Sequence, residues 1–151
     1  MAAQGASELI FFVGAVIISA SLVGVFFAAV SQVSDTIGDS AADAASAAQA
    51  SVTILNDPAH VSYDNVSQNF TLIVKNTGSR TLHVNETLVL LDQFSIANNT
   101  YVWTFIQNVS AWSPGVSVSF TLTGVNLTAS TDHFMKVIAE FGASDTQEFF
   151  W

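Results

Sequence analysis

The hydrophobic pattern of the chain begins with a long apolar run. Residues Leu9 to Val30 read LIFFVGAVIISASLVGVFFAAV, which is 22 residues without a charge. About 20 apolar residues in a helix cross the roughly 30 Å hydrocarbon core of a bilayer, so the run predicts a transmembrane helix. Met1 to Glu8 carries no Lys or Arg. Because a signal peptide would have a basic leader and a shorter apolar stretch, we expect the helix to stay in the mature protein.

The helical pattern continues beyond the apolar run. Apolar side chains recur near one face as far as Ala48, while Asp35, Asp39 and Asp43 repeat every four residues on the opposite face. The pattern predicts one helix of about 40 residues, near 60 Å long. The aspartates are interpreted as a solvated face, with a cation-binding ladder as the less favoured alternative.

A strip of small residues lies inside the predicted span. Ala20, Gly24 and Ala28 repeat every four residues. Such a strip allows the backbone of a second helix to approach closely. We therefore predict that helices assemble through these three residues, and a lone anchor with scattered small residues is the alternative left open.

After residue 48 the pattern changes to a period of two. Phe70, Leu72 and Val74 occupy alternate positions, as apolar residues do in half-buried strands. Strands are predicted at residues 51–55, 69–76, 80–91, 101–107, 116–123, 133–141 and 146–151. The predicted fold class is α+β, with a membrane-spanning and extended helix as domain 1–48 and an all-β, immunoglobulin-like sandwich as domain 49–151. This is the plan of type IV pilin-like subunits.

Turn sequences separate the predicted strands. They are NDP, NTGS, SPG and GASD, which are rich in the residues that favour turns. NTGS, residues 76–79, is interpreted as a hairpin turn in which Gly78 takes a positive φ.

Composition and charge exclude some classes of protein, in particular those that bind nucleic acid. Half of the residues are hydrophobic and only 10% are charged, against about 25% in an ordinary soluble domain. Twelve acidic and three basic residues give a net charge of −9. This charge repels a phosphate backbone, so nucleic acid is excluded as a partner. Cysteine is absent, so the β domain depends on its core and its sheet hydrogen bonds.

Six Asn-x-Ser/Thr sequons follow the predicted span, and none has Pro in the middle position. N-linked glycans are added to extracellular proteins. We therefore predict that at least one sequon is glycosylated, which places the β domain outside the cell and a short N-terminus inside. The candidate acceptors are Asn65, Asn69, Asn85, Asn98, Asn108 and Asn126.

The sequence contains no recognisable catalytic motif. His60, His83 and His133 are isolated and lack the paired spacing of zinc ligands. Asp132-His133 invites comparison with a hydrolase, but the nucleophile elbow Gly-x-Ser-x-Gly is absent. We therefore predict that the protein is not an enzyme and has no catalytic residues, cofactor or metal.

Aromatic residues are a further candidate for binding. Trp103, Trp112, Trp151 and Tyr101 alternate with polar residues or lie near turns. They are interpreted as core side chains, and a sugar-stacking platform is the alternative.

Residues 51–82, SVTILNDPAHVSYDNVSQNFTLIVKNTGSRTL, resemble the opening of the outer domain in the archaellum protein family FlaG, also called ArlG. In that family a Tyr-Asp/Asn element precedes a strand that ends in Lys-Asn-Thr-Gly-Ser, which here are Tyr63-Asp64 and residues 75–79. Residues 7–12 at the start of the span and the final HFMKVIAEFGASDTQEFFW are also similar to the family. The sister family FlaF shares the plan and a similar Asn-x-Gly turn.

The resemblance implies a non-catalytic, membrane-anchored, stator-type component of the archaellum, the archaeal flagellum used for motility. It implies self-assembly through the helix, a β domain in the pseudoperiplasm that contacts the S-layer protein, and a FlaF-like partner. Archaellin, the filament subunit, carries a short basic leader. No Lys or Arg precedes the span here, so we expect the chain to be neither archaellin nor an ordinary pilin. A pilin-like filament subunit and a membrane-tethered module that binds a glycan or peptide are the alternatives.

Overall fold

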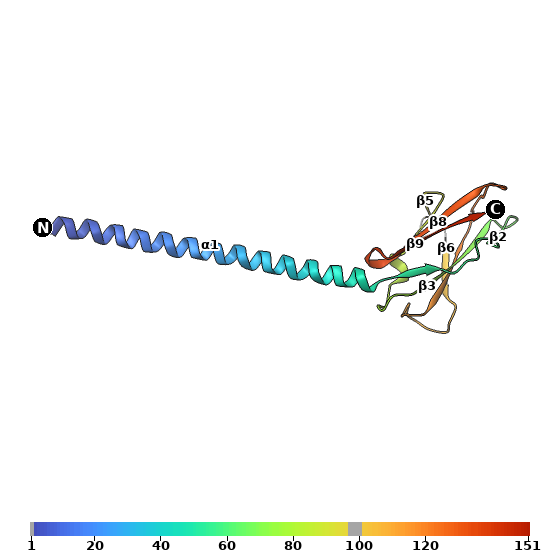
Figure 1. Ribbon diagram of the computed structural model, residues 1–151, viewed down its shortest axis with the longest axis horizontal. Coiled ribbons are helices and arrows are strands. Elements are labelled where there is room, and N and C mark those ends of the chain that lie inside the picture. The colour runs from blue at the N-terminus through green and yellow to red at the C-terminus, as the bar shows by residue number, and fades with distance from the viewer. Residues whose placement is uncertain (1, 97–100) are drawn as a thin grey trace. The chain divides into compact units, whose positions relative to one another are not determined.

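The computed structural model of the chain describes residues 2–96 and 101–151 (Figure 1). The chain forms two compact units, one ending at residue 42 and the other spanning residues 43–151. The first unit is helical, and the second contains the last turns of the same helix and all the described strands. The domain boundary expected after residue 48 stays a prediction.

Helix α1 (Ala2–Gln49) has 48 residues and contains no Pro. The hydroxyls of Ser19 and Ser21 each donate a 2.8 Å hydrogen bond to the carbonyl four residues earlier. These bonds satisfy the hydroxyls without water, which suits an apolar environment. Within the described residues, α1 is the one helix that is long and apolar enough to cross a membrane, and its apolar 18-residue window has a mean hydropathy of 2.6. It is longer than predicted because helical geometry begins ahead of the apolar run.

The strands form two antiparallel sheets. The first has the order β1-β3-β7-β6, with β2 also paired to β3, and the second has the order β5-β4-β8-β9. The strands of the first sheet are β1 (Val52–Ile54), β2 (Ser62–Asp64), β3 (Asn69–Asn76), β6 (Tyr101–Phe105) and β7 (Ser117–Leu122). The strands of the second are β4 (Leu88–Leu91), β5 (Phe94–Ile96), β8 (Asp132–Ile138) and β9 (Ser144–Phe150). A long apolar helix followed by a sandwich of two antiparallel sheets confirms the predicted fold class.

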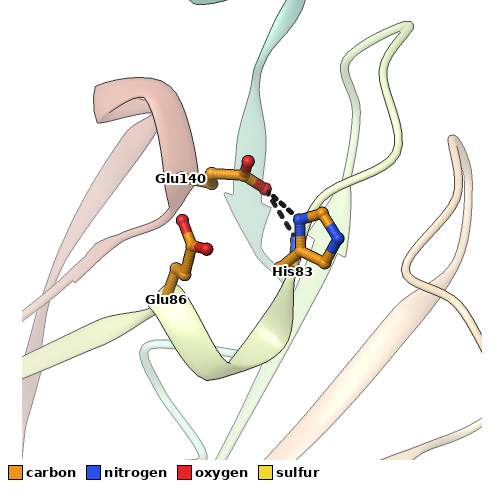
Figure 2. A group of neighbouring side chains, drawn as sticks. All are labelled: His83, Glu86 and Glu140. Carbon is orange, nitrogen blue, oxygen red and sulfur yellow. Dashed lines mark hydrogen bonds and ion pairs between the residues drawn. The ribbon is translucent and has the colours of Figure 1, made fainter.

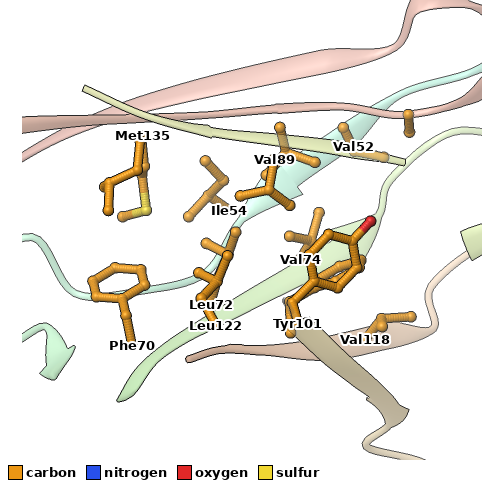
Figure 3. Packing of buried hydrophobic residues seen from close by; sticks show 14 of the residues in the cluster. Val52, Ile54, Phe70, Leu72, Val74, Val89, Tyr101, Val118, Leu122 and Met135 are labelled. Atoms are coloured by element: carbon orange, nitrogen blue, oxygen red, sulfur yellow. The ribbon is translucent and has the colours of Figure 1, made fainter. Parts of the chain in front are cut away.

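The core of the β domain lies between the two sheets. Strand β3 alternates half-buried and buried residues along its whole length. Phe70, Leu72 and Val74 are fully buried, and Figure 3 shows them facing Val89 and Met135 of the other sheet. The register of β3 is fixed because a slip of one residue would turn these side chains toward solvent.

The single strand predicted over residues 80–91 is wrong. Only Leu88–Leu91 is a strand, and a 3-10 turn, η1 (Val84–Glu86), precedes it. Buried residues occupy even positions up to Val84 and odd positions from Thr87 onward. One strand with a period of two cannot bury both sets, so the 3-10 turn takes up the extra residue.

The sequence pattern also misses β2 and β5, which have three residues each. Strands β4 and β5 form a hairpin whose turn residues, Asp92 and Gln93, have φ of 50° and 70°. Positive φ at both positions is the geometry of a type I′ turn, which Asn-Gly usually provides. The less typical pair Asp-Gln therefore gives a weak sequence signal. Asp92 is held in place because its Oδ1 accepts a 2.9 Å hydrogen bond from the Phe134 N–H.

The prediction for Gly78 is also wrong. Among the described residues, the glycines with positive φ are Gly115, Gly124 and Gly142. Gly78 is instead required for close approach: a Cβ there would overlap the backbone oxygen of Gln49 and lie 2.6 Å from the Ser51 nitrogen. The turn is not a hairpin either, because β3 pairs with β1, β2 and β7.

Candidate functional site: the apolar helix and the polar clusters of the β domain

The apolar part of α1 carries large side chains on all its faces. Between Leu9 and Val30 they are exposed by 47% to 80%. A helix that is apolar all round is stable only where lipid or neighbouring helices cover it. This segment therefore needs a second molecule or a membrane as its environment.

The predicted assembly strip lies within this segment. Ala20, Gly24 and Ala28 are exposed, and a Cβ built on Gly24 meets no atom within 4 Å. The strip is therefore open to a second helix, and its role in assembly stays a prediction.

The end of α1 is attached to the β domain by the junction loop, residues 76–80. Asn76 is fully buried, and its amide Nδ2 donates to the carbonyls of Arg80 and Trp112 at 2.7 and 2.8 Å. With the loop held in this way, the backbone N–H of Ser79 donates a 2.9 Å hydrogen bond to the Gln49 carbonyl at the helix end. A backbone donor thus caps one of the last helical carbonyls.

Arg80 adds a side-chain contact to the same junction. Its Nη1 donates a 2.7 Å hydrogen bond to Ser46 Oγ, and its guanidinium lies 4.3 Å from the centre of the Phe141 ring. The KNTGSR sequence that carries the family resemblance therefore builds the connection between helix and sandwich. Sequence reasoning missed this role because its partners lie up to 61 residues away along the chain.

The predicted glycosylation sites differ in exposure. Asn69 is half-buried at the start of β3, where it pairs with Asp64, and Asn98 lies outside the described residues. The exposed acceptors are Asn65, Asn85, Asn108 and Asn126. Glycosylation of any of them stays a prediction.

His133 is buried, and both of its ring nitrogens face acceptors. Nδ1 lies 2.7 Å from Asp92 Oδ2, and Nε2 lies 2.9 Å from the Thr128 carbonyl. A carboxylate and a carbonyl only accept hydrogen bonds, so these two contacts favour the imidazole that is protonated on both nitrogens. The Thr131 hydroxyl also lies 3.1 Å from Nε2. Burial by itself lowers the pKa of His133, but the hydrogen bonds to Asp92 and Thr128 and the charges of Asp92 and Asp132 outweigh it and raise the pKa above 6.5. Because both ring nitrogens are engaged in these contacts, neither is available to accept a proton from a serine in a hydrolase triad.

Another histidine belongs to a cluster of His83, Glu86 and Glu140 (Figure 2). We term it the η1–η2 cluster, because it joins η1 to the 3-10 turn η2 (Glu140–Gly142). One ligand atom of each side chain lies within 4.8 Å of the other two. Glu140 Oε2 accepts hydrogen bonds from His83 Nδ1 at 2.8 Å and from the His83 backbone N–H at 2.9 Å. The hydrogen bond with Glu140 and the charges of both glutamates raise the pKa of His83 above 6.5. The sequence search for paired histidines missed this cluster because its other two members are carboxylates.

The aromatic residues are placed mainly in the core. Tyr101 and Trp112 are buried and pack edge-on against Phe120. Trp103 and Trp151 are half-buried. The four residues considered for a sugar-stacking platform therefore do not all present exposed rings.

Comparison with known sequences identifies one family. The family described as archaeal-type flagellin matches residues 2–149. No curated protein matches the sequence significantly.

Two solved structures are similar to this one. The archaeal flagellum of Methanospirillum hungatei strain JF1 has a TM-score of 0.69 and 15% identity, over 97% of this chain and 92% of that chain. The archaellum periplasmic stator protein FlaG from Sulfolobus acidocaldarius has a TM-score of 0.50 and 15% identity, over 66% of this chain and 99% of that chain. At this identity the structures show a shared fold. Together with the family match they confirm the likeness to archaellum proteins expected from residues 51–82.

Proposed function

The chain belongs to the archaeal-type flagellin family. From the likeness of residues 51–82 to FlaG, we propose that it is a stator-type, non-catalytic structural component of the archaellum. In this proposal α1 anchors the protein in the membrane and assembles with other helices. The β sandwich lies outside the cytoplasm as the domain that contacts other proteins.

The observation that carries the proposal is the exposed apolar surface of α1 from Leu9 to Val30, which contains no charge. Leaving such side chains in water costs roughly 25 cal/mol for each Å² of apolar surface. A bilayer removes this cost, and the backbone of a helix needs no partner there. The acidic residues Asp35, Asp39 and Asp43 follow the run and suit the aqueous side.

The partners of the outer domain follow from the family resemblance. A FlaF-like protein and the S-layer protein are the proposed contacts. The net acidic charge of the chain and its Asn-x-Ser/Thr sequons suit an extracellular setting. The junction loop supports a static role, because it attaches the helix end to the sandwich through backbone hydrogen bonds and Arg80.

A filament subunit is the second candidate. It is favoured by the likeness to the archaeal flagellum of Methanospirillum hungatei, which covers 97% of this chain, helix included, at a TM-score of 0.69. In that case the apolar helices would pack against one another in a filament core, and lipid would surround them only before assembly.

Shearing of archaella separates the two candidates. The full chain, tagged at its C-terminus, is produced in an archaellated host, and the filaments are sheared from the cells and sedimented. A stator-type component stays with the cell membranes and dissolves only with detergent, while the main filament subunit serves as the marker for the sheared fraction. Recovery of the tagged chain along the sheared filaments would reject the stator role in favour of the filament subunit.

A further inference from the structure

The η1–η2 cluster has a feature that the structural role of the protein does not use: it brings three metal-ligating side chains together. His83 and Glu86 lie at η1, whereas Glu140 opens η2 (Glu140–Gly142), 57 residues after His83. Figure 2 shows the three side chains converging from these two connections. The fold therefore places an imidazole and two carboxylates around one point on the surface.

The cluster is short of positive charge. The carboxylates of Glu86 and Glu140 share a single imidazole, and like charges this close repel each other unless a cation compensates them. The chain has only three basic residues. Of these, Arg80 is engaged with Ser46 and with the ring of Phe141. A divalent cation would supply the missing charge.

The ligands are partly held in position. The Glu140 side chain is 13% exposed, and the backbone N–H of His83 fixes its Oε2. Hydrogen bonds of this kind orient carboxylates at metal sites. The His83 side chain is 72% exposed, and Glu86 is also exposed. An ion can therefore reach the cluster from solvent.

We propose that His83, Glu86 and Glu140 bind a divalent transition-metal ion of the zinc class, through Nδ1 and one oxygen from each carboxylate. Tetrahedral zinc ligands at about 2.0–2.2 Å from the ion lie roughly 3.4 Å from one another. The exposed Glu86 side chain therefore moves inward, and the proton on His83 Nδ1 is released as the ion binds. Three protein ligands leave a fourth position for water or for a donor from another chain.

The test uses the full-length chain in detergent and titrates it with Zn²⁺, and with Co²⁺ as the spectroscopic probe. We expect one ion per chain, a Co²⁺ absorption typical of nitrogen and oxygen ligands, and a higher Tm with Zn²⁺. His83→Ala and Glu86→Gln are each expected to weaken Zn²⁺ binding by more than about tenfold and to abolish the Tm increase. Glu86→Gln is expected to fold normally, because the backbone of His83 is held by Glu140 and not by Glu86. Its loss of Zn²⁺ binding would therefore not result from misfolding.

His60→Ala is the matched control. His60 Nδ1 lies 3.2 Å from Asp57 Oδ2 in an exposed pair, so it resembles the His83 pair, but it does not belong to the three-ligand cluster. This variant is expected to bind Zn²⁺ as the unaltered chain does. Equal loss of binding in His60→Ala and His83→Ala, no binding by the unaltered chain, or equally effective competition by Mg²⁺ would each overturn the proposal.

Discussion

At the scale of single residues, protonation of His133 is favoured by its position on β8, beside two loops. Asp92 lies at the β4–β5 turn, Thr128 lies in the loop before β8, and the ring of Phe149 stacks on the imidazole at 5.5 Å. The raised pKa means that the folded state binds the proton more tightly than the unfolded chain. The stability from this site is therefore fully present below pH 6.5 and is lost as the pH rises through the raised pKa.

Replacement of His133 by Gln tests this charge. At about pH 6, we expect His133→Gln to lower the free energy of unfolding by about 2 kcal/mol, since hydrogen bonds to charged groups contribute roughly that much. The difference from the unaltered chain should shrink as the pH rises to about 8.5. Denaturant unfolding of the full chain at both pH values, followed by tryptophan fluorescence, measures it. A difference that does not change with pH would mean that protonation of His133 does not contribute to stability in this pH range.

At position 78, glycine is needed because a side chain would collide with nearby backbone, and not because the residue has a positive φ. We expect Gly78→Ala to lower the free energy of unfolding by about 2 kcal/mol, because the new methyl group overlaps the backbone at Gln49 and Ser51. Gly115→Ala is the control: Gly115 has φ of +83° in open space, so its cost is about 1 kcal/mol from the backbone alone. If the two variants unfold alike in denaturant, the close approach at Gly78 is not important for stability.

At the scale of elements, the two ends of α1 differ in their surface and in their contacts. Its first part is apolar on every face, whereas its last turn is bonded to the junction loop by Ser79 and Arg80. The same helix therefore combines an apolar segment with a segment that is attached to the β domain. The aspartates are placed between these parts, where the helix leaves the apolar segment.

The strip of small residues on α1 gives a prediction for assembly. Gly24→Leu is expected to shift the detergent-solubilised protein from oligomers toward monomers, because a bulky side chain prevents close helix approach. Ala15→Leu is the matched control, since nine residues at 3.6 per turn place Ala15 on the opposite face. Light scattering after size-exclusion chromatography measures the mass. Equal masses for both variants and the unaltered chain would mean that the strip does not mediate assembly.

At the scale of the whole molecule, the prediction concerns the side of the membrane on which the sandwich lies. The exposed acceptors Asn65, Asn85, Asn108 and Asn126 are expected to carry glycans in an archaeal host that glycosylates its surface proteins, and half-buried Asn69 less so. Intact-mass spectrometry should show one glycan mass lost for each Asn→Gln replacement at an occupied site. An unmodified chain in a host whose S-layer protein is glycosylated would argue that the sandwich is not exposed to the glycosylation machinery.

The sequence by itself determined the features that depend on local periodicity. The uncharged run of 22 residues is sufficient for a long apolar helix, and the alternation of Phe70, Leu72 and Val74 is sufficient for a half-buried strand. Residues 51–82 also indicated the likeness to archaellum proteins. These signals need only neighbouring residues, so they can be recognised before the chain is folded.

Only the tertiary structure decided the features that depend on residues far apart in the chain. His83 meets Glu140 across 57 residues, and Asp92 meets His133 across 41. The reason for glycine at position 78 is likewise the backbone of Gln49 and Ser51. No local pattern encodes these distances, because the pairing of strands in the two sheets brings such residues together.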